Sequence, residues 1–173
     1  MAMTKPELLR NLDSRIKALI SYRIDQEEIK VRLDPDTHNR VYFAAAFSRV
    51  IIGRMLLEFL GVGYSTERMA LYQKKPKQKD IQASHFGLAL VDVLTLPPCE
   101  RVQLEKFYSA SHKLVHLTDD PDFNRNLAPD IDPGISLIAR LVNQYVYRPN
   151  GMNLVVPDKF RVMLDKEQPG WDA

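Results

Sequence analysis

The chain has 173 residues and a formal net charge of +2, and 45% of its residues are hydrophobic. This composition excludes wholesale disorder, a collagen-like repeat and a low-complexity chain. The single cysteine, Cys99, excludes an internal disulfide framework and a thiolate zinc site. The near-neutral charge argues against bulk coating of nucleic acid, although it permits a local basic patch. The sequence therefore predicts one globular domain with one core.

The amino-terminal residues and the apolar runs bear on localisation. Residues 1–15 contain no apolar stretch typical of a signal peptide. No apolar run anywhere approaches the ~20 residues that a helix needs to cross a bilayer. We therefore expect a soluble, cytoplasmic protein without a membrane association.

The first predicted helix begins with a capping signal. Thr4 and Glu7 have the spacing of a capping box, in which side chains satisfy the open backbone N–H groups of a helix start. Apolar residues then follow at helical spacing from Leu8 to Ile20. We expect this helix to end before Asp34, because a residue that precedes proline disfavours helical angles.

The second predicted helix runs from about residue 38 to residue 60. Its cap is expected at Asp36–Thr37, and Gly61 can adopt the left-handed conformation that ends a helix. Apolar residues cover most of its circumference, which is typical of a helix at the centre of a bundle. We therefore expect Phe47 and Ile51 to lie in the core.

The middle of the chain gives weaker signals. Residues 66–73 are compatible with a short helix, and the lysine-rich residues 74–79 with an exposed loop. Residues 80–96 fit a strand and a helix equally well, because periodicity decides least in short apolar runs. Pro97–Pro98 predicts the start of a helix that runs to about Leu117, since proline is compatible with a first helical turn.

The last predicted helix is expected to start at Asp132, with Pro133 in its first turn, and to end near residues 148–151. A short extended segment is expected near the carboxyl end, at Leu154–Pro157. Together these elements predict an all-α, single-domain bundle of four to six helices. Residues 1–151 would form the bundle, and residues 152–173 an extension that is either packed on it or mobile.

Two histidines form the most informative pattern. His112 and His116 are four residues apart, so they share one face of the predicted helix. They can act as a structural hydrogen-bonded pair, as catalytic acid and base, or as two ligands of a metal ion that needs a third ligand. The candidate third ligands are His85, His38, Glu105 and Asp119. We favour the structural interpretation and assign no metal, because a two-histidine spacing alone is not specific.

The string from Ser111 to His116 resembles the signature of the HEPN domains, which are helical bundles that often act as metal-independent ribonucleases. That signature is an arginine, a polar residue, three variable residues and a histidine. The resemblance places His112 at the polar position and His116 at the histidine that assists proton transfer, whereas Ser111 stands where the family has arginine. Serine carries no charge, so the stabilisation of a phosphate would have to come from another cation. The candidates are Lys113, Arg49 and Arg54.

The lysines that flank Pro76 are candidate contacts to nucleic-acid phosphates. They are Lys74, Lys75, Lys77 and Lys79. Phosphate contacts need only positive charge, so a solvated surface loop explains these lysines equally well and is the preferred interpretation.

The sequence contains no complete catalytic motif and implies no cofactor, and it leaves open whether the chain is an enzyme. We expect a binding, regulatory or self-associating module whose partner is another protein or a second copy of the chain. The alternatives are a HEPN-like RNA-binding protein or ribonuclease that uses His116, and a metal-binding bundle that uses His112 and His116.

Overall fold

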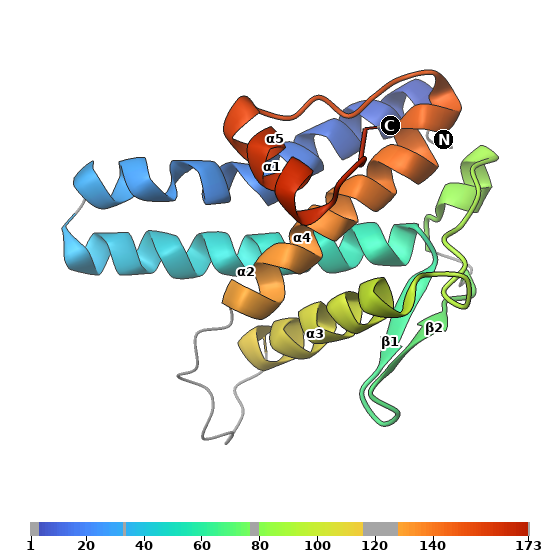
Figure 1. Ribbon diagram of the computed structural model, residues 1–173, viewed down its shortest axis with the longest axis horizontal. Coiled ribbons are helices and arrows are strands. Elements are labelled where there is room, and N and C mark those ends of the chain that lie inside the picture. Colours follow the sequence, from blue (N-terminus) through green and yellow to red (C-terminus); the bar gives the residue numbers. More distant parts are fainter. Residues whose placement is uncertain (1–3, 33, 77–79, 116–127, 173) are drawn as a thin grey trace.

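The fold is built on two long helices, α1 (Lys5–Arg32) and α2 (Pro35–Phe59), which lie side by side (Figure 1). The computed structural model describes residues 4–32, 34–76, 80–115 and 128–172. Within these residues the chain forms a mostly helical single body of five α-helices and one small β-hairpin. The predicted helical fold class is therefore confirmed.

The start of α1 follows the predicted capping signal. The backbone N–H and the hydroxyl of Thr4 both donate to Oε2 of Glu7, each at 2.8 Å. The apolar residues that follow at helical spacing all lie in the core: Leu8, Leu12, Ile16, Leu19 and Ile20. Burying each such side chain contributes about 1.5–3 kcal/mol, so this one face fixes the helix on the bundle.

The cap of α2 lies two residues earlier than predicted. Oδ1 of Asp34 accepts hydrogen bonds from the backbone N–H groups of Asp36, at 3.1 Å, and Thr37, at 3.0 Å. Pro35 occupies the first helical position, where its missing N–H removes no helical bond. The predicted cap at Asp36–Thr37 is therefore wrong, because the carboxylate before the proline already fills that role. At the other end Gly61 has a φ of 83°, as the sequence predicted.

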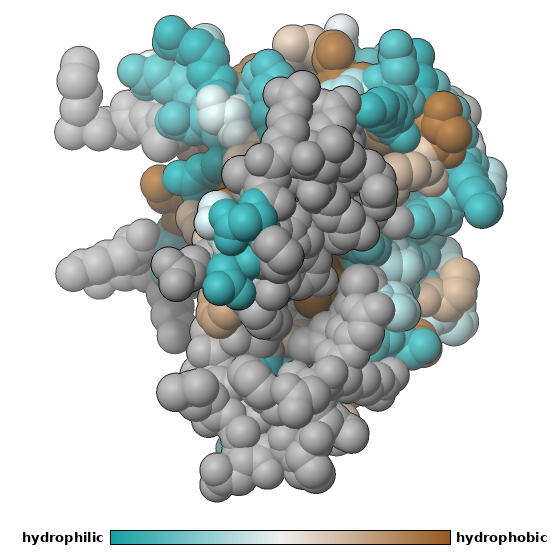
Figure 2. Space-filling view, turned by 90° about the vertical axis from the view of Figure 1, so that its left-hand side faces the viewer, coloured by the Kyte–Doolittle hydropathy of each residue, from teal (hydrophilic) through white to brown (hydrophobic). Residues whose placement is uncertain are grey.

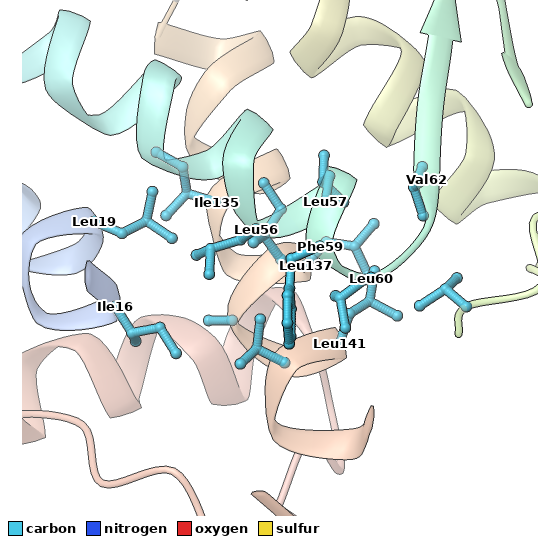
Figure 3. Close-up of a cluster of buried hydrophobic side chains, with 14 of the residues drawn as sticks. Ile16, Leu19, Leu56, Leu57, Phe59, Leu60, Val62, Ile135, Leu137 and Leu141 are labelled. Atoms are coloured by element: carbon cyan, nitrogen blue, oxygen red, sulfur yellow. The ribbon is translucent and has the colours of Figure 1, made fainter. Parts of the chain in front are cut away.

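The core lies where α2 meets α4 (Ala128–Val142) and α1. Figure 3 shows one cluster of buried apolar side chains to which α1 contributes Ile16 and Leu19, α2 contributes Leu56, and α4 contributes Ile135 and Leu137. The prediction that Ile51 lies in the core is wrong, since its side chain is 47% exposed, and Phe47 is only partly buried. Although α2 is apolar on most sides, its neighbours do not surround it.

The connection after α2 is a hairpin of β1 (Val62–Ser65) and β2 (Ala70–Gln73). The strands are antiparallel, with Val62 opposite Gln73 and Gly63 opposite Tyr72. The predicted short helix at residues 66–73 is therefore wrong. The turn includes Met69 at a φ of 48°, a left-handed conformation that interrupts a helix. Residues 80–96 contain only one short 3₁₀ turn, η1 (Ala83–Phe86).

Two helices follow, α3 (Pro98–Val115) and α4, which pack closely on each other. The predicted start of α3 at the proline pair is confirmed. By contrast, α4 begins at Ala128 and continues through Asp132 and Pro133, so the predicted cap at Asp132 is wrong. Its carboxylate instead pairs with Arg49 of α2, with Nη2 to Oδ1 at 2.8 Å.

The carboxyl end of α4 continues through a π-helical turn η3 (Asn143–Tyr147) and a 3₁₀ turn η4 (Arg148–Asn150). Residues 152–157, which include the expected extended segment at Leu154–Pro157, form neither a helix nor a paired strand, and Pro157 has φ and ψ of −59° and 147°. The last helix, α5 (Asp158–Glu167), packs on α4 and α1 through Phe160 and Leu164, which are fully buried.

A buried amide connects this carboxyl-terminal region to the bundle. Asn143 is fully buried, and its Oδ1 accepts the backbone N–H of Leu154 at 2.7 Å. Its Nδ2 donates to the backbone oxygen of Trp171 at 3.2 Å.

At the opposite end of the molecule from the hairpin, the described residues that Figure 2 colours are mostly hydrophilic.

Candidate functional site

A polar pocket of about 200 Å³ opens between α2, the hairpin and α3. It contains three residues that the sequence singled out, Arg54, Lys74 and His112, which are distant in the chain but line the same pocket. We therefore take it as the candidate site. Its lining residues are Arg54, Glu58, Gly63, Tyr64, Thr66, Tyr72, Lys74, Tyr108 and His112.

A larger pocket of about 370 Å³ lies between α1 and α2. Its walls include core side chains such as Leu8, Leu12 and Phe59, and it shares Glu58 and Lys74 with the polar pocket. The polar pocket is the better candidate for specific chemistry, because binding sites need convergent polar groups as well as apolar area.

The structure describes one of the two histidines of the predicted pair. His112 lies in the last turn of α3, is partly buried and lines the polar pocket. His116 lies outside the described residues, so the geometry of the pair stays a prediction. Within the described residues, no group of three or more His, Cys, Asp or Glu side chains is arranged to hold a metal ion.

The structure describes two of the four lysines of the predicted basic loop. Lys74 lies in the pocket wall, where its Nζ is paired with Oε2 of Glu58 and lies 3.5 Å from Oδ2 of Asp80. Lys75 is exposed, whereas Lys77 and Lys79 lie outside the described residues. The charge of Lys74 is therefore already balanced by two carboxylates.

The protonation of Lys74 reflects this balance. Burial alone would lower the pKa of its ammonium group, but the hydrogen bond and charge of Glu58 and the charge of Asp80 outweigh burial. The pKa of Lys74 is therefore raised above its ordinary value, and the group stays positive at physiological pH. It acts as the centre of an ion cluster at one edge of the pocket.

Two tyrosines form the aromatic wall. The rings of Tyr64 and Tyr108 are stacked, with centroids 5.3 Å apart and planes 7° from parallel. Tyr108 donates its hydroxyl to the backbone oxygen of Val62 at 3.0 Å, which attaches α3 to the hairpin. Burial, and then the charge of Glu58, raise the pKa of Tyr108, so its phenol remains neutral. Burial similarly raises the pKa of Tyr64.

The third tyrosine of the pocket, Tyr72, lies opposite a glycine of the hairpin. Gly63 and Tyr72 face each other in the hairpin, and a Cβ atom on Gly63 would lie 2.6 Å from Cζ of Tyr72. Any side chain at residue 63 would therefore displace the ring. Tyr72 is 46% exposed, so the residue is partly open to solvent, and the absence of a side chain at Gly63 leaves the space that its ring occupies.

Arg54 supplies the positive charge of the pocket. It lies on α2, is half-buried, and its charge acts on the Tyr108 hydroxyl. No residue that the structure describes forms a hydrogen bond or an ion pair with its guanidinium group. Arg49, one and a half turns earlier, is different, because it is 5% exposed and binds the backbone oxygen of Leu19 and the Asp132 carboxylate. Only Arg54 of these two arginines lines the pocket.

The sequence did not predict most of this site. Arg54 and Glu58 carry a visible signal, since they are four residues apart in the otherwise apolar residues 50–59. Tyr64, Tyr72 and Tyr108 carry none, because tyrosines at these separations are ordinary in any core. Their convergence depends on the hairpin, which the sequence did not predict.

Comparison of the chain with protein-family models, with curated proteins and with solved structures gives no match in any of the three. Among the described residues, no helix is both long enough and apolar enough to cross a membrane. The interpretation of the pocket therefore depends on its own geometry.

Proposed function

We propose that this chain is a binding module whose polar pocket takes a small anionic ligand. The observation that carries the proposal is Arg54, a partly buried residue that lines the pocket and has no hydrogen bond or ion pair to any described residue. A charged group that is partly removed from water is stabilised by a hydrogen-bonding partner of opposite charge. A bound anion supplies that partner, because charge-assisted hydrogen bonds to guanidinium are among the strongest in proteins.

The remaining polar groups support the same ligand. The hydroxyls of Thr66 and Tyr72 line the pocket and can donate to an anion. Lys74 adds positive charge but is compensated by Glu58 and Asp80, so Arg54 is the cation in the wall that is left for a ligand. Because Lys74 is compensated and Arg54 is available, the pocket favours an anion of low charge.

The test is calorimetric titration of the full chain with sodium acetate, benzoate and phosphate, with Arg54→Gln as the variant. Arg10→Gln is the matched control, because Arg10 is exposed on α1. We expect at least one anion to bind the unmodified chain, and Arg54→Gln to weaken it by about tenfold or more, the loss of one charge-assisted interaction. Equal binding by the unmodified chain and Arg54→Gln would contradict the proposal.

We propose a HEPN-like ribonuclease as the second candidate. The observation that favours it is that Arg54 and His112 line one pocket. Arg54 is thereby a candidate for the charge that Ser111 cannot supply on α3, with His116 as the residue of proton transfer. The test is cleavage of single-stranded RNA by the unmodified chain, His116→Ala and Arg54→Gln. Activity that persists in His116→Ala would remove this mechanism.

A further inference from the structure

Resting on the proposed anion site, we propose that the ligand of the polar pocket is a small aromatic monocarboxylate of the benzoate class. The ligand would place its carboxylate on Arg54 and its ring against Tyr72. The size of the pocket, its charge and its aromatic walls each favour such a ligand.

The size of the pocket limits the ligand. Its volume is about 200 Å³, whereas pockets for drug-sized ligands occupy about 300–1,000 Å³. A ligand with a single substituted ring suits a pocket below that range.

The charge of the pocket selects among small anions. Arg54 is the cation available to a ligand, because Lys74 is held by Glu58 and Asp80. The planar guanidinium group presents two parallel N–H donors that match the two oxygens of a carboxylate. A phosphate dianion would bring a second negative charge next to Glu58 without a second available cation. A monocarboxylate therefore complements the pocket better than phosphate does.

The aromatic walls select for a flat ligand. Tyr64 and Tyr108 are stacked at 5.3 Å, and Tyr72 lies over Gly63 with 46% of its surface exposed. A pair of aromatic rings in an offset or edge-to-face arrangement is stabilised beyond the effect of the apolar area that it buries, because the quadrupoles of the two rings attract each other. Such a contact increases affinity by about fivefold beyond the area that is buried. Gly63 is a positioning residue here, because a Cβ atom at residue 63 would displace the Tyr72 ring.

The test compares benzoate with cyclohexanecarboxylate, which has the same charge and a similar size but no aromatic ring. Both are titrated calorimetrically into the full chain, alongside inorganic phosphate and adenosine monophosphate. We expect benzoate to bind about fivefold more tightly than cyclohexanecarboxylate and more tightly than either phosphate compound. We expect Tyr72→Leu and Gly63→Ala to abolish the preference for the aromatic ring, and Arg54→Gln to weaken both carboxylates equally. Circular dichroism shows whether each variant retains its helices.

The outcomes separate this inference from the proposal beneath it. If cyclohexanecarboxylate binds as tightly as benzoate, or if a phosphate compound binds more tightly, the ligand class is wrong, although the anion site stands. If none of the four compounds binds, the anion site itself is refuted. If Tyr72→Leu or Gly63→Ala fails to fold, the comparison of the two carboxylates on the unmodified chain still decides.

Discussion

Two buried tyrosines allow a matched test of what a single hydroxyl contributes to stability. Tyr108 and Tyr147 are 4% and 6% exposed. The hydroxyl of Tyr108 donates to the Val62 backbone oxygen at 3.0 Å, whereas the buried hydroxyl of Tyr147 has no hydrogen-bond partner among the described residues. Replacing each by phenylalanine removes the hydroxyl and keeps the ring, so the two changes differ mainly in the hydrogen bond.

The expected effects have different signs. Tyr108→Phe removes a hydrogen bond worth about 1 kcal/mol and leaves the oxygen of Val62, a fully buried residue, less well satisfied, so the free energy of unfolding should fall by about 1–3 kcal/mol. Tyr147→Phe removes a buried polar atom that gains nothing in return, so stability should stay unchanged or rise by up to about 1 kcal/mol. Urea unfolding followed by far-ultraviolet circular dichroism measures both. Equal losses in the two variants would refute the argument.

The same pair predicts the response to alkaline pH. Burial raises the pKa of Tyr108, and burial followed by the charge of Asp13 raises the pKa of Tyr147 to about 12. The unfolded state therefore loses these protons first, at a pKa of about 10. Stability should be constant below that value and should fall as pH rises above it. Each phenylalanine variant should show a shallower fall between about pH 9 and 12, and an unchanged slope would contradict the assignment.

Two further predictions concern the core. Arg49→Met should destabilise the protein by about 3 kcal/mol, the lower end for a broken buried pair, because Asp132 is 24% exposed and can partly rehydrate. An urea midpoint equal to that of the unmodified chain would show that the pair is not structural. Leu57→Ala should cost about 2–5 kcal/mol, since Leu57 is fully buried. Ile51→Ala should cost less than about 1 kcal/mol, since Ile51 is 47% exposed; comparable thermal shifts in the two variants would contradict their different burial.

The helices that the sequence predicted well are those whose signals are local. The contact of Thr4 with Glu7 lies within one turn of helix, and Gly61 ends α2 through its own backbone preference. Such interactions depend on residues a few positions apart. They therefore form the same way whatever the rest of the chain does.

The predictions from the sequence are wrong where a side chain that looks like part of a local motif instead interacts with a residue far away in the chain. Asp132 followed by Pro133 has the sequence of a helix start, but its carboxylate binds Arg49, 83 residues away in the chain. The Asp132 carboxylate therefore forms an ion pair and does not cap the helix. Helix α4 begins one turn earlier, at Ala128. The hairpin has a similar cause, since the pairing of Gly63 with Tyr72 depends on the close approach of the ring to a residue without a side chain.

The candidate site shows the same limit most clearly. From the sequence, Arg49 and Arg54 were equivalent candidates for the charge that Ser111 does not provide. The fold separates them, because the guanidinium group of Arg49 binds a backbone oxygen of α1 and a carboxylate of α4, whereas Arg54 lines the polar pocket together with the three tyrosines. Whether such an arginine stabilises the fold or binds a ligand therefore depends on the residues around it. Those residues belong to other helices and to the hairpin, and the spacing of residues in the sequence does not reveal which of them lie close to each arginine.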